Sequence, residues 1–309
     1  MEQGLYIKQK ENNMKKILIT GKDSYIGTSV EQYLLNKGNY AIDTLDMKDN
    51  DWKNYQFSGY DVVFHVAGIA HADTGKLTKE RKALYYNVNT KLVLDTAKKA
   101  KQSGVGQFIL MSSMIIYGDS AGIGENKIIT ENTEPKPSSV YGNSKWLADK
   151  GVQKLQDERF KVVVLRPPMI YGRNSKGNYP LLSKLAKITP IFPNIKNQRS
   201  MLYVENLCEF IKLLIDEEQS GVYFPQNREY VETKELVSCI ADVKGHYLIF
   251  ISVFNKIIYF VAKYNKTLGR IINKIFGNMV YEKSMSEYEK MDYRIYSLEE
   301  SIRKTEERE

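Results

Sequence analysis

The stretch from Lys16 to Leu35 constrains the fold more than any other part of the chain. Lys16–Thr20 is a short apolar run, the glycine-bounded turn Gly21–Gly27 follows, and a helical pattern then continues to Leu35. Glycines between a strand and a helix let the backbone approach a pyrophosphate, and the helix N-terminus stabilises negative charge. This order predicts a dinucleotide site in a doubly wound α/β sheet, although Ser24 stands where a middle glycine is usual.

A second strand, over residues 40–45, ends at Asp46. A carboxylate at this distance from the glycine turn hydrogen-bonds a ribose 2′-hydroxyl and repels a 2′-phosphate. Asp46 therefore favours NAD over NADP, but Lys22 and Lys48 could offset the repulsion, so NADP remains possible. Asp43 is the competing acid if the strand register differs.

The segment Asp61–Gly68 has almost no polar interruption, which is typical of a parallel strand covered on both faces. Ala67 and Gly68 are small enough for a cofactor to lie against. His65 is predicted to be a packed histidine, because no nearby residue pairs with it. His71 follows in the loop at the carboxyl end of the strand, where such sheets bind ligands, and is a candidate substrate contact.

Residues 79–101 approximate a helical pattern through the apolar residues Leu84, Val88, Leu92, Leu94 and Ala97. Asn87 lies within this helix and could reach the cofactor region. The next strand, over residues 107–113, places the hydroxyl of Ser113 at its carboxyl end. Ser113 is therefore a candidate for binding a substrate oxygen.

Tyr141 and Lys145 are four residues apart and share one face if this stretch is helical. A neighbouring ammonium favours the phenolate and lowers the pKa of a tyrosine. Tyr141 is therefore a candidate acid/base, with Lys145 as its partner and Ser113 beside it.

The net charge of +8 could attract nucleic acid, an anionic membrane or a phosphate-bearing substrate, and its sign does not choose among them. No apolar run is long enough to span a bilayer, and residues 1–13 lack the apolar region of a signal peptide. We expect a cytoplasmic protein without a nucleic-acid partner or stable membrane insertion. Cys208 and Cys239 stand in no metal-binding pattern, so no metal is predicted.

These segments together resemble the extended short-chain dehydrogenases/reductases that act on nucleotide sugars. The resemblance covers residues 14 to about 215. The matching pieces are Thr20-Gly-x-x-Ser-x-x-Gly27, Asp46, His65-Val-Ala-Gly68, Asn87-Val-Asn, Ser112-Ser113, Tyr141-x-x-x-Lys145 and Leu165-Arg-Pro-Pro-Met-Ile-Tyr-Gly172. The resemblance implies that Tyr141 is the acid/base, that Lys145 binds the nicotinamide ribose, and that Ser113 orients the substrate. It also implies a cofactor site lined by Gly21, Ser24, Tyr25, Ile26, Gly27, Asp46, Ala67, Gly68, Asn87, Tyr141, Lys145 and Pro168.

One departure from this family narrows the expected chemistry. Its 4,6-dehydratases carry an Asp-Glu pair just after the catalytic hydroxyl residue, and Met114-Ile115 occupy that place here. An apolar pair cannot act as general acid and base, so dehydration is not expected. Hydride transfer at a sugar carbon remains, and we expect it at C4 of a UDP-hexose or UDP-N-acetylhexosamine, in a 4-epimerase. The alternatives are a reductase of a UDP-4-keto-6-deoxy-sugar in surface polysaccharide synthesis and a non-catalytic NAD(P)-binding regulator, against which Ser113, Tyr141 and Lys145 argue.

The remainder of the chain is predicted to bind the substrate. Residues 177–180 and 199–207 resemble the family segments that hold a nucleotide diphosphate, so Asn178 and Arg199 are candidate substrate ligands. An Arg-x-Gly-Asp segment, present near the C-terminus of many epimerases, is missing. A surface arginine is the alternative interpretation of Arg199.

The predicted organisation is an N-terminal extension (1–13), a Rossmann domain (14–172) and a smaller, mainly substrate-binding domain (173–309) with some segments returning to the Rossmann core. The apolar and basic stretch 247–280 is either helices of the second domain or a segment that touches anionic lipid, which leaves weak membrane-surface contact open.

A homodimer is also expected. In proteins similar to this one, two helices per subunit meet in a four-helix bundle, and the corresponding helices here are predicted at 79–101 and 138–157. Leu147, Val152 and Leu155 supply an apolar face, although these side chains could equally face their own sheet.

Overall fold

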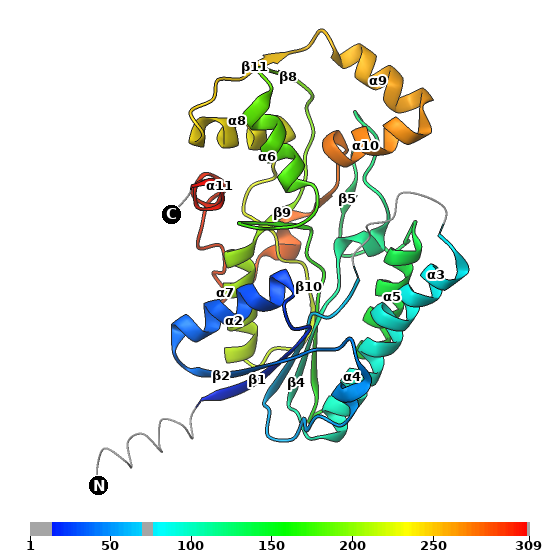
Figure 1. Ribbon diagram of the computed structural model, residues 1–309, viewed down its shortest axis with the longest axis vertical. Helices are drawn as coiled ribbons and strands as arrows, with labels where there is room; N and C mark the ends of the chain where they lie inside the picture. Colours follow the sequence, from blue (N-terminus) through cyan, green and yellow to red (C-terminus); the bar gives the residue numbers. More distant parts are fainter. Residues whose placement is uncertain (1–13, 70–76, 308–309) are drawn as a thin grey trace. The chain divides into compact units, whose positions relative to one another are not determined.

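The computed structural model describes residues 14–69 and 77–307, which group into two compact units (Figure 1). The first unit lies within Met1–Ile116, Pro137–Arg166 and Cys208–Tyr223, and the second within Tyr117–Lys136, Pro167–Leu207 and Phe224–Glu309. Residues 208–223 thus group with the first unit, and residues 117–136 with the second.

The described part of the first unit is built on a six-stranded sheet with the order β10-β6-β4-β3-β1-β2, in which all neighbours are parallel. Its strands are β1 (Lys15–Thr20), β2 (Tyr40–Leu45), β3 (Val62–His65), β4 (Gln107–Met111), β6 (Lys161–Leu165) and β10 (Gly221–Tyr223). Every residue of β3 and β4 is buried, as expected of parallel strands covered on both faces. The predicted doubly wound α/β fold is confirmed.

Helices cover both faces of this sheet (Figure 1). Helix α2 and the Cys208–Asp216 part of α7 lie on one face, where the Tyr33 hydroxyl donates to Glu209 over 2.6 Å. Helices α3, α4 and α5 lie on the other face. The elements outside the sheet are α2 (Tyr25–Lys37), η1 (Asn50–Lys53), α3 (Lys79–Tyr86), a π-helical turn η2 (Asn87–Leu92), α4 (Val93–Gln102), η3 (Met114–Tyr117), α5 (Val140–Gln153) and α7 (Val204–Asp216).

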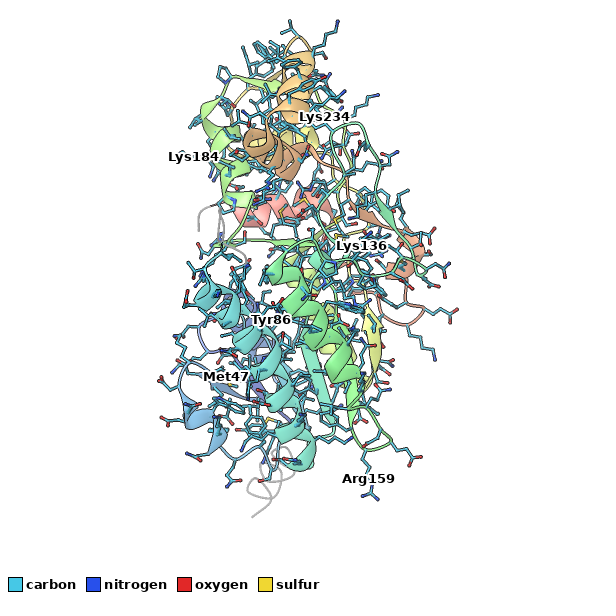
Figure 2. The ribbon with its side chains drawn as sticks, turned by 90° about the vertical axis from the view of Figure 1, so that its right-hand side faces the viewer. Met47, Tyr86, Lys136, Arg159, Lys184 and Lys234 are labelled. Atoms are coloured by element: carbon cyan, nitrogen blue, oxygen red, sulfur yellow. The ribbon has the colours of Figure 1, made fainter. Side chains whose placement is uncertain are left out.

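The helical stretch from α3 to α4 turns an unexpected face inward. Tyr85, Asn89 and Val93, spaced four apart, are fully buried, whereas Leu84 is 39% exposed. Packing thus selects the face on which Asn89 finds hydrogen-bond partners. Asn143 on α5 donates to the Tyr86 hydroxyl over 2.9 Å, which ties α3 to α5 (Figure 2).

The second unit combines short parallel strand pairs with helices. The pairs are β11 with β8, β12 with β5 and β7 with β9. The strands are β5 (Ile128–Ile129), β7 (Met169–Tyr171), β8 (Ile191–Pro193), β9 (Met201–Tyr203), β11 (Ile249–Ile251) and β12 (Val280–Tyr281). The helices are α6 (Tyr179–Ile188), α8 (Thr233–Val243), α9 (Asn255–Tyr264), α10 (Lys266–Phe276), η4 (Lys283–Ser286) and α11 (Leu298–Glu306). Within the described ranges, no helix is long and apolar enough to cross a membrane.

Candidate active site

The glycine turn lies where the strand order changes direction, with β2 on one side of β1 and β3 on the other. Gly21 has a φ of +110°, and a Cβ there would lie 2.7 Å from the Ala67 nitrogen. The N–H groups of Gly21 and Lys22 donate to the Leu45 carbonyl, and that of Ala67 donates to the Thr20 carbonyl. The carboxyl ends of β1, β2 and β3 therefore meet at Gly21, the position at which such sheets bind ligands.

Helix α2 begins directly after this turn. The Ser24 side chain caps the helix by accepting a hydrogen bond from the Gly27 N–H over 3.2 Å. Gly27 packs closely against the capping side chain, since a Cβ at this position would lie 2.5 Å from Ser24 Oγ. The first turn, which starts with Tyr25 and Ile26, has no acidic residue. Its N-terminal N–H groups and dipole therefore suit an anion such as a pyrophosphate.

Asp46 follows β2, whose last residue receives the two hydrogen bonds from the glycine turn. Its carboxylate accepts from the Lys48 N–H over 2.9 Å, lies 3.5 Å from the Lys48 ammonium, and is exposed. The backbone hydrogen bond from Lys48 holds the pKa of Asp46 below its usual value. Asp43, the competing acid, accepts from the Tyr60 hydroxyl over 2.6 Å. Asp46 stays the predicted ligand of the ribose, because it stands at the end of β2 beside the glycine turn.

His65 is the last residue of β3, and His71 follows it in the sequence. His65 is fully buried, its Nδ1 lies 2.7 Å from the Thr20 hydroxyl, and burial lowers its pKa to about 3. It is thus a packed neutral histidine, as predicted. His71, the candidate substrate contact, lies outside the described residues.

Asn89 is a site residue that the sequence interpretation missed in favour of Asn87, whose side chain is exposed. The Asn89 Oδ1 accepts from the Ile69 N–H over 2.9 Å, while its Nδ2 donates to the Ile69 carbonyl and to Ser144 Oγ. Asn89 therefore clamps the loop after β3 onto α5. The signal was present in the segment Asn87-Val-Asn89, but the sequence did not say which asparagine faces the sheet.

Tyr141 and Lys145 both lie in the first half of α5. The helix is capped by Ser139, and a Cβ on Gly142 would lie 3.0 Å from the Ile115 carbonyl, so a larger residue would push against η3. The Lys145 ammonium donates to the Met111 carbonyl, at the end of β4, over 2.9 Å. A Cβ on Gly68 would lie 3.4 Å from the same ammonium. The carboxyl ends of β3 and β4 thus converge on Lys145.

Burial controls the proton affinities of this pair. It lowers the pKa of Lys145 to about 8, against the opposing charge of Asp149. Burial, with a smaller contribution from Tyr85, raises the pKa of Tyr141 to about 12. The direction predicted for Tyr141 from the nearby ammonium is therefore wrong for the protein without ligands, because desolvation of the phenolate dominates the shift.

Ser113 is the second residue after β4, two residues after Met111, whose carbonyl accepts from the Lys145 ammonium. Its hydroxyl oxygen accepts from the Ile115 N–H over 3.3 Å, which draws η3 back towards the strand end. Met114 is buried and Ile115 is partly buried, so the place of an Asp-Glu pair is apolar in space as well as in sequence. Ser113 therefore supplies the polar group of this segment.

A buried network lies behind the site. Asp149 accepts from Arg166 Nε and Nη2, each over 2.9 Å, and from the Ser112 hydroxyl over 2.8 Å. The aspartate is fully buried and Arg166 nearly so. The sequence interpretation did not identify this pair, although Tyr141, Lys145 and Asp149 are spaced at i, i+4 and i+8 and so share one helix face.

Three predicted ligands belong to the second unit. Pro168 is buried, and Asn178 stands half-buried directly before α6. Arg199 pairs with Val231 and Met279 through its backbone, and its guanidinium donates to the carbonyls of Lys274 and Ile275 at the end of α10. Burial lowers the pKa of Arg199 to about 10. The guanidinium thus stabilises the helix C-terminus, and its role towards phosphate stays a prediction.

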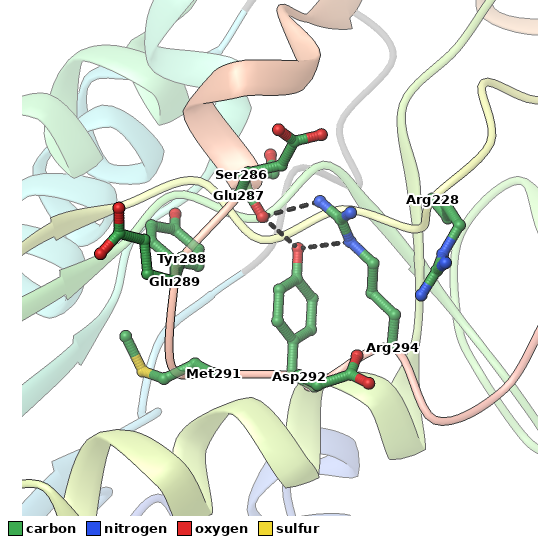
Figure 3. A pocket seen from close by; sticks show the side chains of 9 residues that line it. Arg228, Ser286, Glu287, Tyr288, Glu289, Met291, Asp292 and Arg294 are labelled. Atoms are coloured by element: carbon green, nitrogen blue, oxygen red, sulfur yellow. Dashed lines mark hydrogen bonds between the residues drawn. The ribbon is translucent and has the colours of Figure 1, made fainter.

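A cavity of about 270 Å³ lies in the second unit, lined by Arg228, Ser286, Glu287, Tyr288, Glu289, Met291, Asp292, Tyr293 and Arg294 (Figure 3). The Arg294 guanidinium donates to the Ser286 carbonyl over 2.7 Å and to the Tyr293 hydroxyl over 3.3 Å (Figure 3). It also donates to the Gln226 carbonyl. Arg294 therefore holds the segment 286–294 in place.

The sheet, the glycine turn and the Tyr141–Lys145 pair define a Rossmann-type dinucleotide-binding protein. A family model described as "NAD dependent epimerase/dehydratase family" matches residues 17–225. The chain belongs to this family.

Two curated relatives and one solved structure extend the comparison. The chain is 30% identical over 249 residues to UDP-glucose 4-epimerase of Vibrio cholerae, covering 74% of this chain and 75% of the relative. It is 30% identical to N-acetyl-alpha-D-glucosaminyl-diphospho-ditrans,octacis-undecaprenol 4-epimerase of Escherichia coli O157:H7, covering 57% of this chain and 52% of the relative. UDP-glucuronic acid 4-epimerase from Bacillus cereus, solved in complex with NAD, shares the fold with a TM-score of 0.68 at 16% identity, covering 93% of this chain and 96% of that one.

Proposed function

We propose that the protein is an NAD-dependent UDP-sugar 4-epimerase that acts on a UDP-hexose or a UDP-N-acetylhexosamine. One arrangement carries the proposal: α5 holds Tyr141 on the same helix face as Lys145, whose ammonium contacts the end of β4 two residues before Ser113. This arrangement lies at the carboxyl edge of the sheet, where α/β folds bind ligands. The similarity to two 4-epimerases supports reaction at C4.

In this proposal Tyr141 removes the proton from the sugar O4, and Ser113 hydrogen-bonds the same oxygen. Bound NAD supplies the hydride acceptor for C4 and later the hydride donor. After the 4-keto sugar has rotated in the site, the opposite face of C4 would take back the hydride, and Tyr141 would return the proton to O4. Its raised pKa keeps the phenol protonated in the protein without ligands, so proton removal from O4 depends on Lys145 remaining an ammonium.

The cofactor site fits NAD in three respects. Gly21 lies at the switch point with a backbone packed against Ala67, the first turn of α2 suits a pyrophosphate, and Asp46 is an exposed acid beside the turn. Lys145 would bind the nicotinamide ribose.

We expect Asp46→Ala to narrow the preference for NADH over NADPH, measured by fluorescence titration, because the substitution removes the charge that repels a 2′-phosphate. Tighter binding of NADPH by the parent protein would contradict this assignment.

The decisive experiment incubates purified protein with UDP-glucose, UDP-GlcNAc or a UDP-4-keto-6-deoxy-sugar, with and without NAD(P)H. We expect C4 epimers of the first two without consumption of NADH. Stoichiometric oxidation of NAD(P)H with the keto sugar, and no epimerisation, would instead assign the 4-ketoreductase. NAD(H) binding without turnover of any substrate would favour a regulator.

We propose further that the protein forms a homodimer in the cytoplasm. Leu84 on α3 and Leu147 on α5 are 39% and 38% exposed and could take part in such a contact. Val152 belongs to the core of its own unit, so it cannot contribute as expected. Light scattering that gave a mass near 35.7 kDa at micromolar concentration would contradict the dimer.

A further inference from the structure

Helix α9 exposes an apolar stripe. The stripe is formed by Val253, Ile257, Phe260 and Tyr264, which are 71%, 61%, 64% and 65% exposed. Their spacing of four, three and four residues places them along one side of the helical stretch, with Val253 just before its start. Among the described residues of α9, none is buried. The usual reason for such a stripe, packing against the core, therefore does not apply.

The exposure belongs to an ordered helical hairpin. A Cβ on Gly269 would lie 2.4 Å from the Ala262 carbonyl, so glycine permits α10 to approach α9 closely. Asn265 caps α10 by accepting from the N–H groups of Thr267 and Leu268. At the other end Phe276 is buried, with its ring 5.8 Å from that of Phe192. The hairpin thus keeps its shape while the stripe stays uncovered.

The sequence segment that carries the stripe has charge of one sign. From Val243 to Tyr281 the sequence contains no aspartate or glutamate. Among the described side chains of α9 and α10, the exposed cations are Lys256, Lys263, Arg270 and Lys274. Apolar side chains accompanied by cations are the composition of helices that lie in the interface of an anionic membrane.

We propose that α9 and α10 form a docking surface for an anionic lipid membrane, with the α9 stripe and the exposed Leu268 and Ile271 of α10 entering the headgroup boundary. A second copy of the chain is a poorer partner for this surface, because two such faces would bring like charges together. The surface requires no helix that spans the bilayer.

Vesicle co-sedimentation tests the apolar part. Vesicles of equal parts phosphatidylglycerol and phosphatidylcholine should bind the parent protein, and pure phosphatidylcholine vesicles should bind it more weakly. The double variant Ile257→Glu/Phe260→Glu should bind the anionic vesicles at least about tenfold more weakly, since it places charge in the apolar stripe. Leu35→Glu is the matched control, because Leu35 on α2 is 51% exposed and lies in the other unit. It should bind as the parent does.

A charge-matched pair tests the electrostatic part. The test variant Lys256→Glu/Lys263→Glu should weaken binding to anionic vesicles and make the binding less sensitive to salt. The control variant Lys154→Glu/Arg159→Glu changes the net charge by the same amount, on exposed residues of the first unit. It should weaken vesicle binding less. Circular dichroism verifies that all variants fold.

Absence of vesicle binding by the parent, or equal losses in test and control variants, would overturn the proposal. A concentration-dependent mass abolished by Ile257→Glu/Phe260→Glu, without vesicle binding, would assign the surface to a second copy instead. Epimerisation of a soluble UDP-sugar should be unchanged in this variant, so the membrane surface and the proposed activity can fail separately.

Discussion

Helices α5 and α9 distribute charged and apolar side chains in opposite ways. α5 buries Lys145 and Asp149 to 7% and 0% exposure, whereas α9 leaves Ile257 and Phe260 more than half exposed. The two buried charges of α5 have partners in the same unit: the Met111 carbonyl for Lys145, and Arg166 with Ser112 for Asp149. The apolar side chains of α9 have no comparable cover.

Each arrangement costs free energy that an ordinary helix avoids. Burial of Lys145 destabilises its charged form and brings its pKa to about 8, close to the range in which a proton-transfer site works. Exposed apolar side chains at helical spacing disfavour solubility and commonly mark a binding surface. The two helices therefore point to two kinds of function, proton chemistry at α5 and association at α9.

The largest expected effect comes from Arg166→Met, which leaves the buried Asp149 carboxylate without its cation. Removing one partner of a buried ion pair typically costs about 3–5 kcal/mol, so we expect a loss of this size in urea unfolding. Lys161→Met is the control, since its ion pair with Glu218 is exposed and should contribute less than about 1 kcal/mol. Equal losses in both variants would show that burial does not distinguish the α5 network.

Tyr141→Phe should reduce turnover by at least about 100-fold with folding intact, because it removes the acid/base hydroxyl and little volume. Steady-state epimerisation of a UDP-sugar measures the effect. Tyr60→Phe removes a hydroxyl that bonds Asp43 and should remain active. Near-normal turnover of Tyr141→Phe would end the proposed mechanism.

The depressed pKa of Lys145 predicts a pH dependence of stability in the protein without ligands. Between about 8, its folded value, and 10.5, its reference value, the unfolded chain holds a proton that the folded chain lacks. The free energy of unfolding should therefore rise with pH in this window, by on the order of 1 kcal/mol or more, relative to Lys145→Met. Urea unfolding from pH 8 to about 10 checks it. Parallel curves for the two proteins would mean that burial of Lys145 costs little.

The smallest effect is expected for Phe260→Ser. Because Phe260 is 64% exposed, its removal should change the free energy of unfolding by no more than about 0.5 kcal/mol. Thermal and urea unfolding measure the change. A loss above about 2 kcal/mol would show that the α9 ring is packed in solution, and the contrast with α5 would disappear.

The fold and the main elements of the site followed from local patterns. The glycine turn, Asp46 and the Tyr141–Lys145 spacing were readable because strand, turn and helix formation depend on neighbouring residues. The identity of the buried asparagine was not readable. Asn87 and Asn89 differ only in the helix face they occupy, and that face is set by contacts with Ile69 and Ser144, which are distant in sequence.

The pKa of Tyr141 and the exposure of the α9 side chains also depend on tertiary packing. From sequence, Lys145 should lower the pKa of Tyr141, but burial raises it because the desolvation of each group depends on all the atoms around it. From sequence, the stretch 247–280 is expected to form helices of the second domain, with an interfacial segment as the alternative. Only the tertiary fold leaves α9 without a buried side chain, because no local pattern specifies whether another element will cover an apolar stripe.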